Sequence, residues 1–314
     1  MLAFLVQRVV AVTIQLFVAA TVTFLLLQLV PGDPVWVMLG DNATEEAVEA
    51  LRRELGLDQP VAVQYGQWLA GAARLDLGAS LTTRRPVLDE LMLRLPRTLE
   101  LSLVALVIAV LVGIPIGLLS ALHRGTLFDL ALSASAVLGY SVPVFVVGFL
   151  MVLVFSLQLG WFPPSGYVAF ADAPMMHLRQ VAMPAIAISI GITAITIRMT
   201  RSATLEILNQ DYVRTAHAKG LRRLRVLFVH VLRNAFIPIL TVLGYYFGQT
   251  FGGSILTEQI FNWPGLSFLL INGIQQRDYP MVQGAVLVIV ALFLVVNLLV
   301  DIAYGFLDPR IRQS

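Results

Sequence analysis

The sequence contains no cysteine and a single lysine, Lys219. Charged residues make up 13% of the 314 residues, roughly half of the ~25% that is usual in soluble domains. Without cysteine, the chain has no disulfides, thiolate metal sites or cysteine nucleophiles. The lysine lies in Ala218-Lys-Gly220, whereas a P-loop requires Gly-Lys followed by Ser or Thr. A charged, water-exposed globular surface and ATP hydrolysis by a P-loop are both excluded.

Groups that could carry catalysis are also scarce. Histidine occurs at four positions, 123, 177, 217 and 230, and their spacing matches no metal-binding pair. An aspartyl membrane protease would need two carboxylates within the membrane, and only Asp301 comes close to a membrane-spanning stretch. A serine membrane protease would need a histidine within the membrane, and no histidine lies in such a stretch. We therefore predict no catalytic residue, no metal site and no enzymatic activity.

Hydrophobic residues, in contrast, make up 58% of the chain, and the mean hydropathy is +0.83. A membrane-spanning helix needs about 20 apolar residues. Six uncharged stretches serve as candidates: Val9–Val30, Leu101–Leu122, Leu130–Leu157, Gln180–Ile197, Asn234–Thr257 and Met281–Val300. They predict an all-α membrane protein with six transmembrane helices. We take the first stretch as a retained helix, because its apolar run exceeds the roughly 7–15 residues of a signal peptide.

The six stretches contain no Asp, Glu, Lys, Arg or His. Transporters coupled to protons or sodium usually have ionisable residues in the middle of their membrane-spanning helices. If the protein moves a solute uphill, the energy must therefore come from another subunit.

Basic residues gather on one side of the predicted bundle. Between the fourth and fifth stretches lie Arg198, Arg201, Arg214, Lys219, Arg222, Arg223, Arg225 and Arg233. The only acidic residues there are Glu206 and Asp211. Because positive loops stay in the cytosol, this segment and both termini are predicted to be cytosolic.

The predicted organisation has four parts. Residues 1–30 hold the N-terminal cytosolic segment and first helix, and residues 31–97 form an extracytosolic loop domain with its own short helices. Residues 98–304 form a core of five transmembrane helices, which includes a cytosolic coupling region at residues 209–233. The loop domain is either a small solvated cap or a docking surface for an extracytosolic partner.

Prolines and aromatic residues predict bends in the core. Pro115, Pro143, Pro184 and Pro238 lie within the second to fifth stretches, where proline kinks membrane helices. The segment 251–265 is rich in glycine and aromatic residues. It is either an aromatic belt at the membrane surface or part of an external gate.

The cytosolic segment Asp211–Gly220 predicts a short helix. Asp211 is a suitable N-cap, and Gly220 is suited to the left-handed position after the last turn. Beyond it, apolar residues at helical spacing predict one helix face: Leu221, Leu224, Leu227, Phe228, Val231 and Leu232. The pattern is compatible with two alternatives: a helix that rests on anionic lipid, and a helix that contacts a cytosolic protein. Nucleic-acid binding is not expected, because the basic segment lies against the membrane.

Several motifs together carry a family resemblance. The segment 211–220, followed by His230-Val-Leu-Arg-Asn-Ala-Phe-Ile-Pro238, resembles the coupling-loop motif of bacterial ATP-binding cassette (ABC) importer permeases. Further motifs are similar to the dipeptide, oligopeptide and nickel branch: Pro31-Gly-Asp-Pro34, Glu54-Leu-Gly-Leu-Asp-Gln-Pro60, Asp76-Leu-Gly78, Arg94-Leu-Pro-Arg-Thr-Leu-Glu100 and Leu307-Asp-Pro-Arg310. The chain has Arg214-Thr-Ala216 where the general motif has Glu-Ala-Ala. Arg214 or Asp211 would then supply the polar contact of the usual glutamate.

The resemblance implies the transmembrane domain of a type I importer in the bacterial cell membrane. It implies four kinds of partner: membrane lipid, a second homologous permease subunit, two cytosolic ATPases and an extracytosolic peptide-binding protein. ATP and Mg²⁺ would bind the ATPases, and this chain would hold no cofactor. Residues implied in ATPase coupling are Asp211, Tyr212, Arg214, Thr215, Ala216, His217, Ala218, Lys219, Gly220 and Arg222.

The substrate and its path are harder to predict. Di- or oligopeptides fit the resemblance best, and nickel chelates, glutathione and oligosaccharides are alternatives within the family. An ATP-independent secondary transporter or channel is the alternative from another class. Polar candidates for the path or gate are Ser141, Tyr245, Tyr246, Gln249, Ser254 and Glu258.

Overall fold

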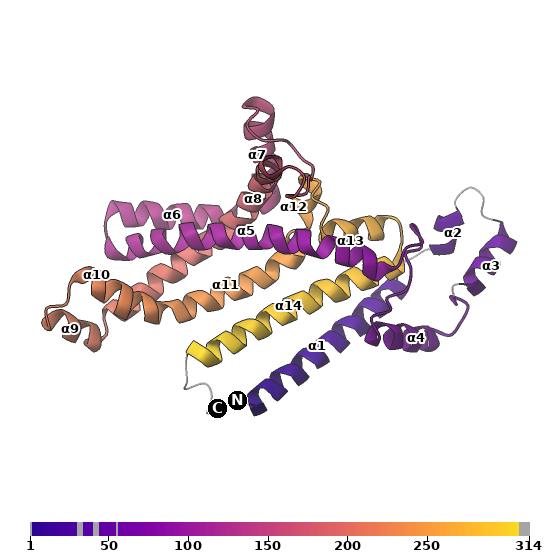
Figure 1. Ribbon diagram of the computed structural model, residues 1–314, viewed down its shortest axis with the longest axis horizontal. Coiled ribbons are helices and arrows are strands. Elements are labelled where there is room, and N and C mark those ends of the chain that lie inside the picture. Colours follow the sequence, from indigo (N-terminus) through magenta and orange to yellow (C-terminus); the bar gives the residue numbers. More distant parts are fainter. Residues whose placement is uncertain (1, 30–33, 40–43, 55, 308–314) are drawn as a thin grey trace. The chain divides into compact units, whose positions relative to one another are not determined.

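The computed structural model describes residues 2–29, 34–39, 44–54 and 56–307 (Figure 1). Within these ranges the regular structure is helical, and the one β-bridge joins Ala79 to Pro86. The chain divides into two compact units, which we describe separately. One unit comprises Leu99–Trp263 with the two ends of the chain, and the other comprises Val6–Thr98 and Pro264–Leu294. Most of the motifs at Pro31–Pro34 and Leu307–Arg310 lies outside the described residues.

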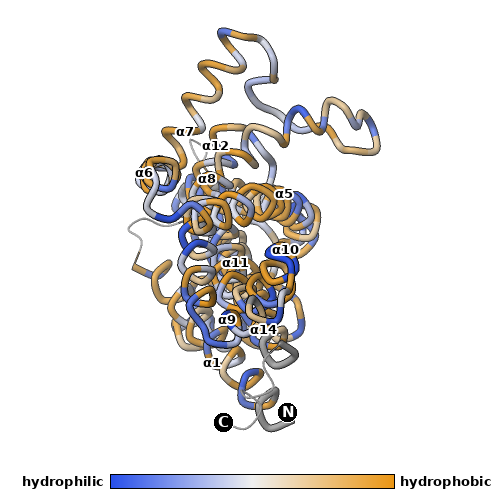
Figure 2. Tube along the Cα trace, turned by 90° about the vertical axis from the view of Figure 1, so that its left-hand side faces the viewer, coloured by the Kyte–Doolittle hydropathy of each residue, from blue (hydrophilic) through white to orange (hydrophobic). Residues whose placement is uncertain are grey.

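Five long helices are apolar enough to cross a membrane, as their colours in Figure 2 illustrate. They include α1 (Leu2–Gln28), α5 (Val87–Leu122), α8 (Pro174–Leu208), α11 (Arg233–Gly253) and α14 (Tyr279–Leu307). The shorter helices are α2 (Pro34–Leu39), α3 (Glu45–Glu54), α4 (Val61–Ala73), α9 (Asp211–Ala218), α10 (Arg223–Arg225), α12 (Ile255–Ile260) and α13 (Leu266–Gln275). A sixth span is reached in the described chain only if a bent pair of helices counts as one.

The bent pair replaces the predicted single helix Leu130–Leu157. Helix α6 (Leu127–Ser141) is followed by α7 (Val144–Met151) and the π-helical segment η2 (Val152–Gln158), with a bend of 95° between them. Pro143 causes the break, because it has no N–H to donate and forces Val142 into an extended conformation with ψ 123°. Helices α5, α8 and α11 instead continue through Pro115, Pro184 and Pro238.

The unit around Leu99–Trp263 has a core between α5, α8 and α11. Small residues let the backbones of α5 and α8 approach closely, as in other membrane helix pairs. A Cβ atom added at Gly113 would lie 2.8 Å from Thr196 Cβ, and one at Gly117 would lie 2.6 Å from the carbonyl oxygen of Ile197. The buried residues of this core are Leu101, Ala105, Ala109, Val181, Ala185, Ile188, Ile192, Ala203, Ala235, Ile239, Leu243 and Trp263.

The segment 251–265 bends as predicted, because α11 ends at Gly253 and the short helix α12 follows. Its aromatic side chains do not form a belt toward lipid. Phe251, Phe261 and Trp263 are buried, and the rings of Trp263 and Tyr167 pack edge to face with centroids 4.9 Å apart. The aromatic-belt interpretation is therefore wrong for these residues, and the external-gate interpretation stays a prediction.

The second unit contains the helices of the predicted loop domain. Thr44 caps α3 by accepting a hydrogen bond from the Ala47 amide at 3.3 Å, and Gly56 follows the helix with φ +68°. The loop before α5 is attached to the start of α14 through the buried Asp278 carboxylate. This carboxylate accepts hydrogen bonds from the Ser80 hydroxyl and from the amides of Leu81, Thr82 and Met281.

Asp278→Ala is expected to lower the thermal stability of the purified protein. The substitution leaves several donors without an acceptor, and each buried donor left unpaired costs about 1–3 kcal/mol. Thermal unfolding in detergent should show a clearly lower midpoint for Asp278→Ala. The exposed Asp172 gives the control Asp172→Ala, and equal midpoints for the two variants would contradict the prediction.

Candidate coupling segment and pocket

Helix α9 begins at Asp211, three residues after α8 ends at Leu208. The Gln210 carbonyl accepts from the amides of Val213 and Arg214 at 3.1 and 3.3 Å. Asp211 is thus the first residue of the helix and not its cap, and its carboxylate pairs with Arg214 Nη1 at 3.5 Å. Both side chains are exposed, so this pair contributes little to stability.

Gly220 ends the segment in the left-handed conformation that the sequence predicts, with φ +78°. The amide of Leu221 donates to the carbonyl of Ala216 at 3.3 Å, across the turn. This is the Schellman arrangement, in which a left-handed residue lets the chain reverse while capping the last carbonyls. The turn directs the chain from α9 into α10.

One face of α9 is anchored and the other is open. Val213 and Ala216 are buried in a cluster with Leu118 of α5 and with Val226 and Val231 of the π-helical segment η3 (Val226–Leu232). The remaining predicted coupling residues whose side chains are described are exposed: Asp211, Tyr212, Arg214, Thr215, Ala218, Lys219, Gly220 and Arg222. The His217 side chain lies outside the described part. Hydrophilic residues gather at α9 and α10 (Figure 2).

The predicted apolar face from Leu221 to Leu232 is partly wrong. Leu227 and Val231 are buried, but Leu224 and Phe228 are exposed. The cause is η3, whose i→i+5 hydrogen bonds place residues five apart on one face. Val226, which the α-helical spacing leaves out, is buried for that reason together with Val231.

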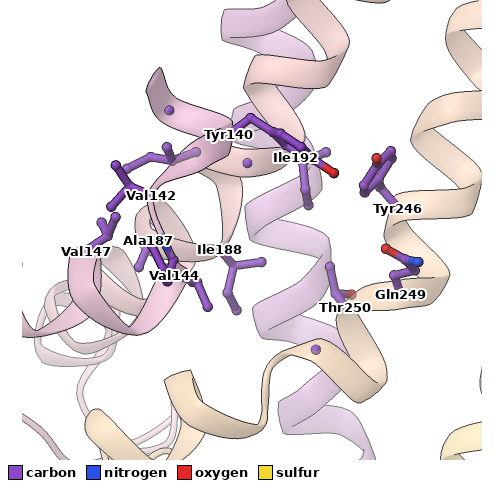
Figure 3. A pocket seen from close by; sticks show the side chains of 15 residues that line it. Tyr140, Val142, Val144, Val147, Ala187, Ile188, Ile192, Tyr246, Gln249 and Thr250 are labelled. Atoms are coloured by element: carbon purple, nitrogen blue, oxygen red, sulfur yellow. The ribbon is translucent and has the colours of Figure 1, made fainter. Parts of the chain in front are cut away.

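A pocket of about 390 Å³ lies beside the break at Pro143 (Figure 3). Its polar side chains come from α6 and α11, and Figure 3 shows Tyr140 and Tyr246 directed toward one another with Gln249 beside Tyr246. None of the described residues that line it is charged. The lining residues are Gly139, Tyr140, Val142, Pro143, Val144, Val147, Ala187, Ile188, Ile190, Gly191, Ile192, Tyr246, Gln249, Thr250 and Gly253.

The structure brings together only some of the predicted path residues. Tyr246 and Gln249 line the pocket, and the Tyr245 hydroxyl accepts from Gln249 Nε2 at 2.8 Å from outside it. Ser141 is exposed and donates to the Val137 carbonyl.

Ser254 and Glu258 are buried and do not line this pocket. The sequence interpretation missed Tyr140 and Thr250, although Tyr140 stands directly before Ser141 and close to Pro143.

An ion pair with a buried carboxylate was also missed. Arg201 of α8 donates to both carboxylate oxygens of Asp129 in α6, from Nε to Oδ1 at 2.7 Å and from Nη2 to Oδ2 at 2.8 Å. The Ser120 hydroxyl and the Gly125 amide donate to the same carboxylate at 2.6 and 3.0 Å. The signal in the sequence was an aspartate at the start of an apolar run, three residues after the helix cap Thr126.

With this geometry established, two family matches cover nearly the whole chain. Residues 113–313 match the family described as "Binding-protein-dependent transport system inner membrane component". Residues 1–102 match the one described as "Binding-prot-dependent transport system membrane comp, N-term". The chain belongs to this family.

Full-length relatives support the assignment to this inner membrane component family. A Brucella abortus (strain 2308) protein named as a peptide transport system permease is 45% identical over 314 residues, covering 100% of both chains. The di/tripeptide transport system permease protein DppB of Pseudomonas aeruginosa (strain UCBPP-PA14) is 43% identical over 340 residues, and covers 100% of both. The dipeptide transport system permease protein DppB of Escherichia coli (strain K12) is 40% identical over 343 residues, again covering 100% of both.

A solved structure shares the fold of this family member. It is the MetNI methionine ABC transporter in inward-facing conformations, with a TM-score of 0.56 at 18% identity, covering 69% of this chain and 96% of that chain. The predicted all-α importer fold and the resemblance to ABC importer permeases are confirmed. The protein is a multi-pass inner membrane permease of a binding-protein-dependent transport system.

Proposed function

We propose that this permease imports di- or oligopeptides that an extracytosolic binding protein delivers. The observation that carries the proposal is the 40–45% identity, over the full chain, to relatives named as peptide, di/tripeptide and dipeptide permeases. The pocket also supports it. Hydroxyl and amide groups without charged neighbours suit the repeated N–H and C=O groups of a peptide backbone.

Energy is proposed to enter at α9 from two cytosolic ATPases, which bind the ATP and Mg²⁺. The chain has no P-loop of its own, and α9 offers a solvent-exposed polar face on a helix anchored to α5 and η3. A second, homologous permease subunit completes the membrane part. In this proposal the present chain is not catalytic, and it converts movement of α9 into opening and closing of the path.

Reconstitution with these partners tests the proposal. The four-subunit complex in liposomes, supplied with the binding protein, should take up a radiolabelled dipeptide only when ATP is present. A nickel chelate, glutathione and a short oligosaccharide serve as competitors, and one that displaces the dipeptide completely would identify a different substrate. Uptake by this chain alone without ATP would instead support a secondary transporter or channel.

Tyr246→Phe is expected to raise the KM for peptide uptake with little change in the amount of assembled complex. The substitution removes only a pocket hydroxyl, and one hydrogen bond contributes about 0.5–1.5 kcal/mol, or roughly 2- to 13-fold in affinity. Uptake rates across peptide concentrations measure the effect. Ser141→Ala, which removes an exposed hydroxyl outside the pocket, is the matched control. If Tyr246→Phe has the same KM as this control, the Tyr246 hydroxyl does not contact the peptide.

A further inference from the structure

The Asp129–Arg201 pair is a densely hydrogen-bonded charge cluster between α6 and α8. Asp129 is only 5% exposed, and its two oxygens accept from Arg201, Ser120 and Gly125. A bidentate contact between guanidinium and carboxylate fixes orientation as well as distance. The pair therefore holds α6, the end of α5 and α8 in one arrangement.

Helix α6 packs along α8, but few of its side chains are buried in that contact. All of α6 is described, and its buried residues are Asp129 and Ala136. Ala136 packs with Ala194 and Ile197 of α8, which is a small apolar contact. Most of the large side chains of α6 are exposed, so the ion pair is the main polar connection from α6 to α8.

The pair also joins two helices, one of which leads to α9 and the other to the pocket. Arg201 precedes the end of α8 by seven residues, and α9 begins three residues later. Leu118, two residues before Ser120 on α5, packs against Val213 and Ala216 of α9. At the other end of α6, Gly139 and Tyr140 line the pocket.

From this placement we propose that Asp129 and Arg201 are positioning residues that make α6 move together with α8 when the coupling segment is displaced. The inference rests on the proposed function of this chain as an ATP-driven importer. Through the pair, a displacement at α9 reaches Tyr140 on the pocket wall. Without it, α8 still follows α9, but α6 and its pocket residues follow only through the apolar packing around Ala136 and Gly139.

Single and double variants separate this role from simple stabilisation. Asp129→Asn or Arg201→Gln alone leaves one partially buried charge without its partner, which destabilises the fold. The double variant Asp129→Asn/Arg201→Gln leaves no such charge, so its assembly is expected to recover. Its coupling is expected to stay low, because neutral amides do not reproduce the bidentate contact.

The experiment uses the complete complex with its ATPases and binding protein in liposomes. Peptide imported per ATP hydrolysed is measured for the wild type, the two single variants, the double variant and two controls. The controls Arg124→Gln and Glu206→Gln each remove an exposed charge near the same end of the bundle. The double variant is expected to assemble normally, hydrolyse ATP, and import at least about fivefold less peptide per ATP. The controls are expected to match the wild type.

Two outcomes of this experiment overturn the inference. A normally assembled double variant with the wild-type ratio would show that α6 does not need the pair to follow α8. Equal losses in the exposed-charge controls would show that replacing any charged side chain at this end of the bundle lowers the ratio. Failure of the proposed function is distinguishable from both, because the wild-type complex would then show no ATP-dependent peptide uptake at all.

A distance measurement gives a readout that a purely stabilising role would leave unchanged. Because the chain has no cysteine, spin labels can be placed at Leu138→Cys in α6 and Ser202→Cys in α8 without removing others. With the pair intact, the distance between the labels is expected to stay constant with and without ATP. In the double variant it is expected to broaden or change with ATP. A constant, narrow distance in both proteins would overturn the inference.

Discussion

Gly220→Val is expected to nearly abolish ATP-driven uptake while the membrane bundle stays folded. Gly220 has φ +78°, and a left-handed conformation costs an ordinary residue about 1–2 kcal/mol, with β-branched residues tolerating it least. The short helix α9 has few contacts with which to offset that cost. About 2 kcal/mol reduces the population of the native turn roughly thirtyfold. Peptide uptake and ATPase activity of the assembled complex measure the outcome.

The control for this prediction is Gly220→Asn. Asparagine enters the left-handed region far more readily than valine, so this variant is expected to retain most uptake. Space does not distinguish the two residues, since a Cβ at position 220 would have nothing within 4 Å. Equal activity of the valine and asparagine variants would contradict a role for the left-handed turn.

Gly117→Ala is expected to have the second large effect, through failure of α5 to pack on α8. The added Cβ would lie 2.6 Å from the Ile197 carbonyl oxygen and 2.7 Å from Thr200 Cβ. A backbone carbonyl in the middle of a helix cannot move aside as the tip of a side chain can. Overpacking of this kind costs about 1–3 kcal/mol or more, so the purified variant should unfold at a clearly lower temperature or fail to accumulate.

Gly191→Ala is the matched control for this packing prediction. Gly191 lies on α8, and a Cβ there would meet nothing within 4 Å. In a helix, alanine is favoured over glycine by about 1 kcal/mol, so the control is expected to be as stable as the wild type or slightly more so. Similar unfolding temperatures for the two variants would show that the α5–α8 contact tolerates a methyl group.

The sequence predicted those features that depend on neighbouring residues. Long apolar runs located the membrane helices, and Gly220 marked the end of α9 because only a left-handed residue closes a helix in that way. The 95° bend at Pro143 was underestimated. All four prolines give the same local signal, and only the surrounding packing decided that α5, α8 and α11 continue while α6 ends.

Features that depend on distant residues escaped prediction. From the sequence, Arg201 was grouped with the other arginines predicted to be cytosolic. No neighbouring residue in the sequence indicates that its partner lies 72 positions earlier. The pocket is lined by Tyr246 and Gln249 of α11 and by Tyr140 of α6. Ser254 and Glu258 are instead buried outside the pocket. Polarity identified candidates, but the arrangement of α6, α8 and α11 selected among them.

The π-helical segment η3 also determines the rotational phase of α11. Successive residues of an α-helix are about 100° apart, so one extra residue accommodated in a π turn offsets every later side chain by about that angle. Tyr246, Gln249 and Thr250 face the pocket with this offset already included. One continuous helix, formed by η3 and α11, therefore leads from the neighbourhood of α9 to the pocket. Conversion of the π turn to a regular α-helical turn would rotate α11, so that a different face of this helix would line the pocket.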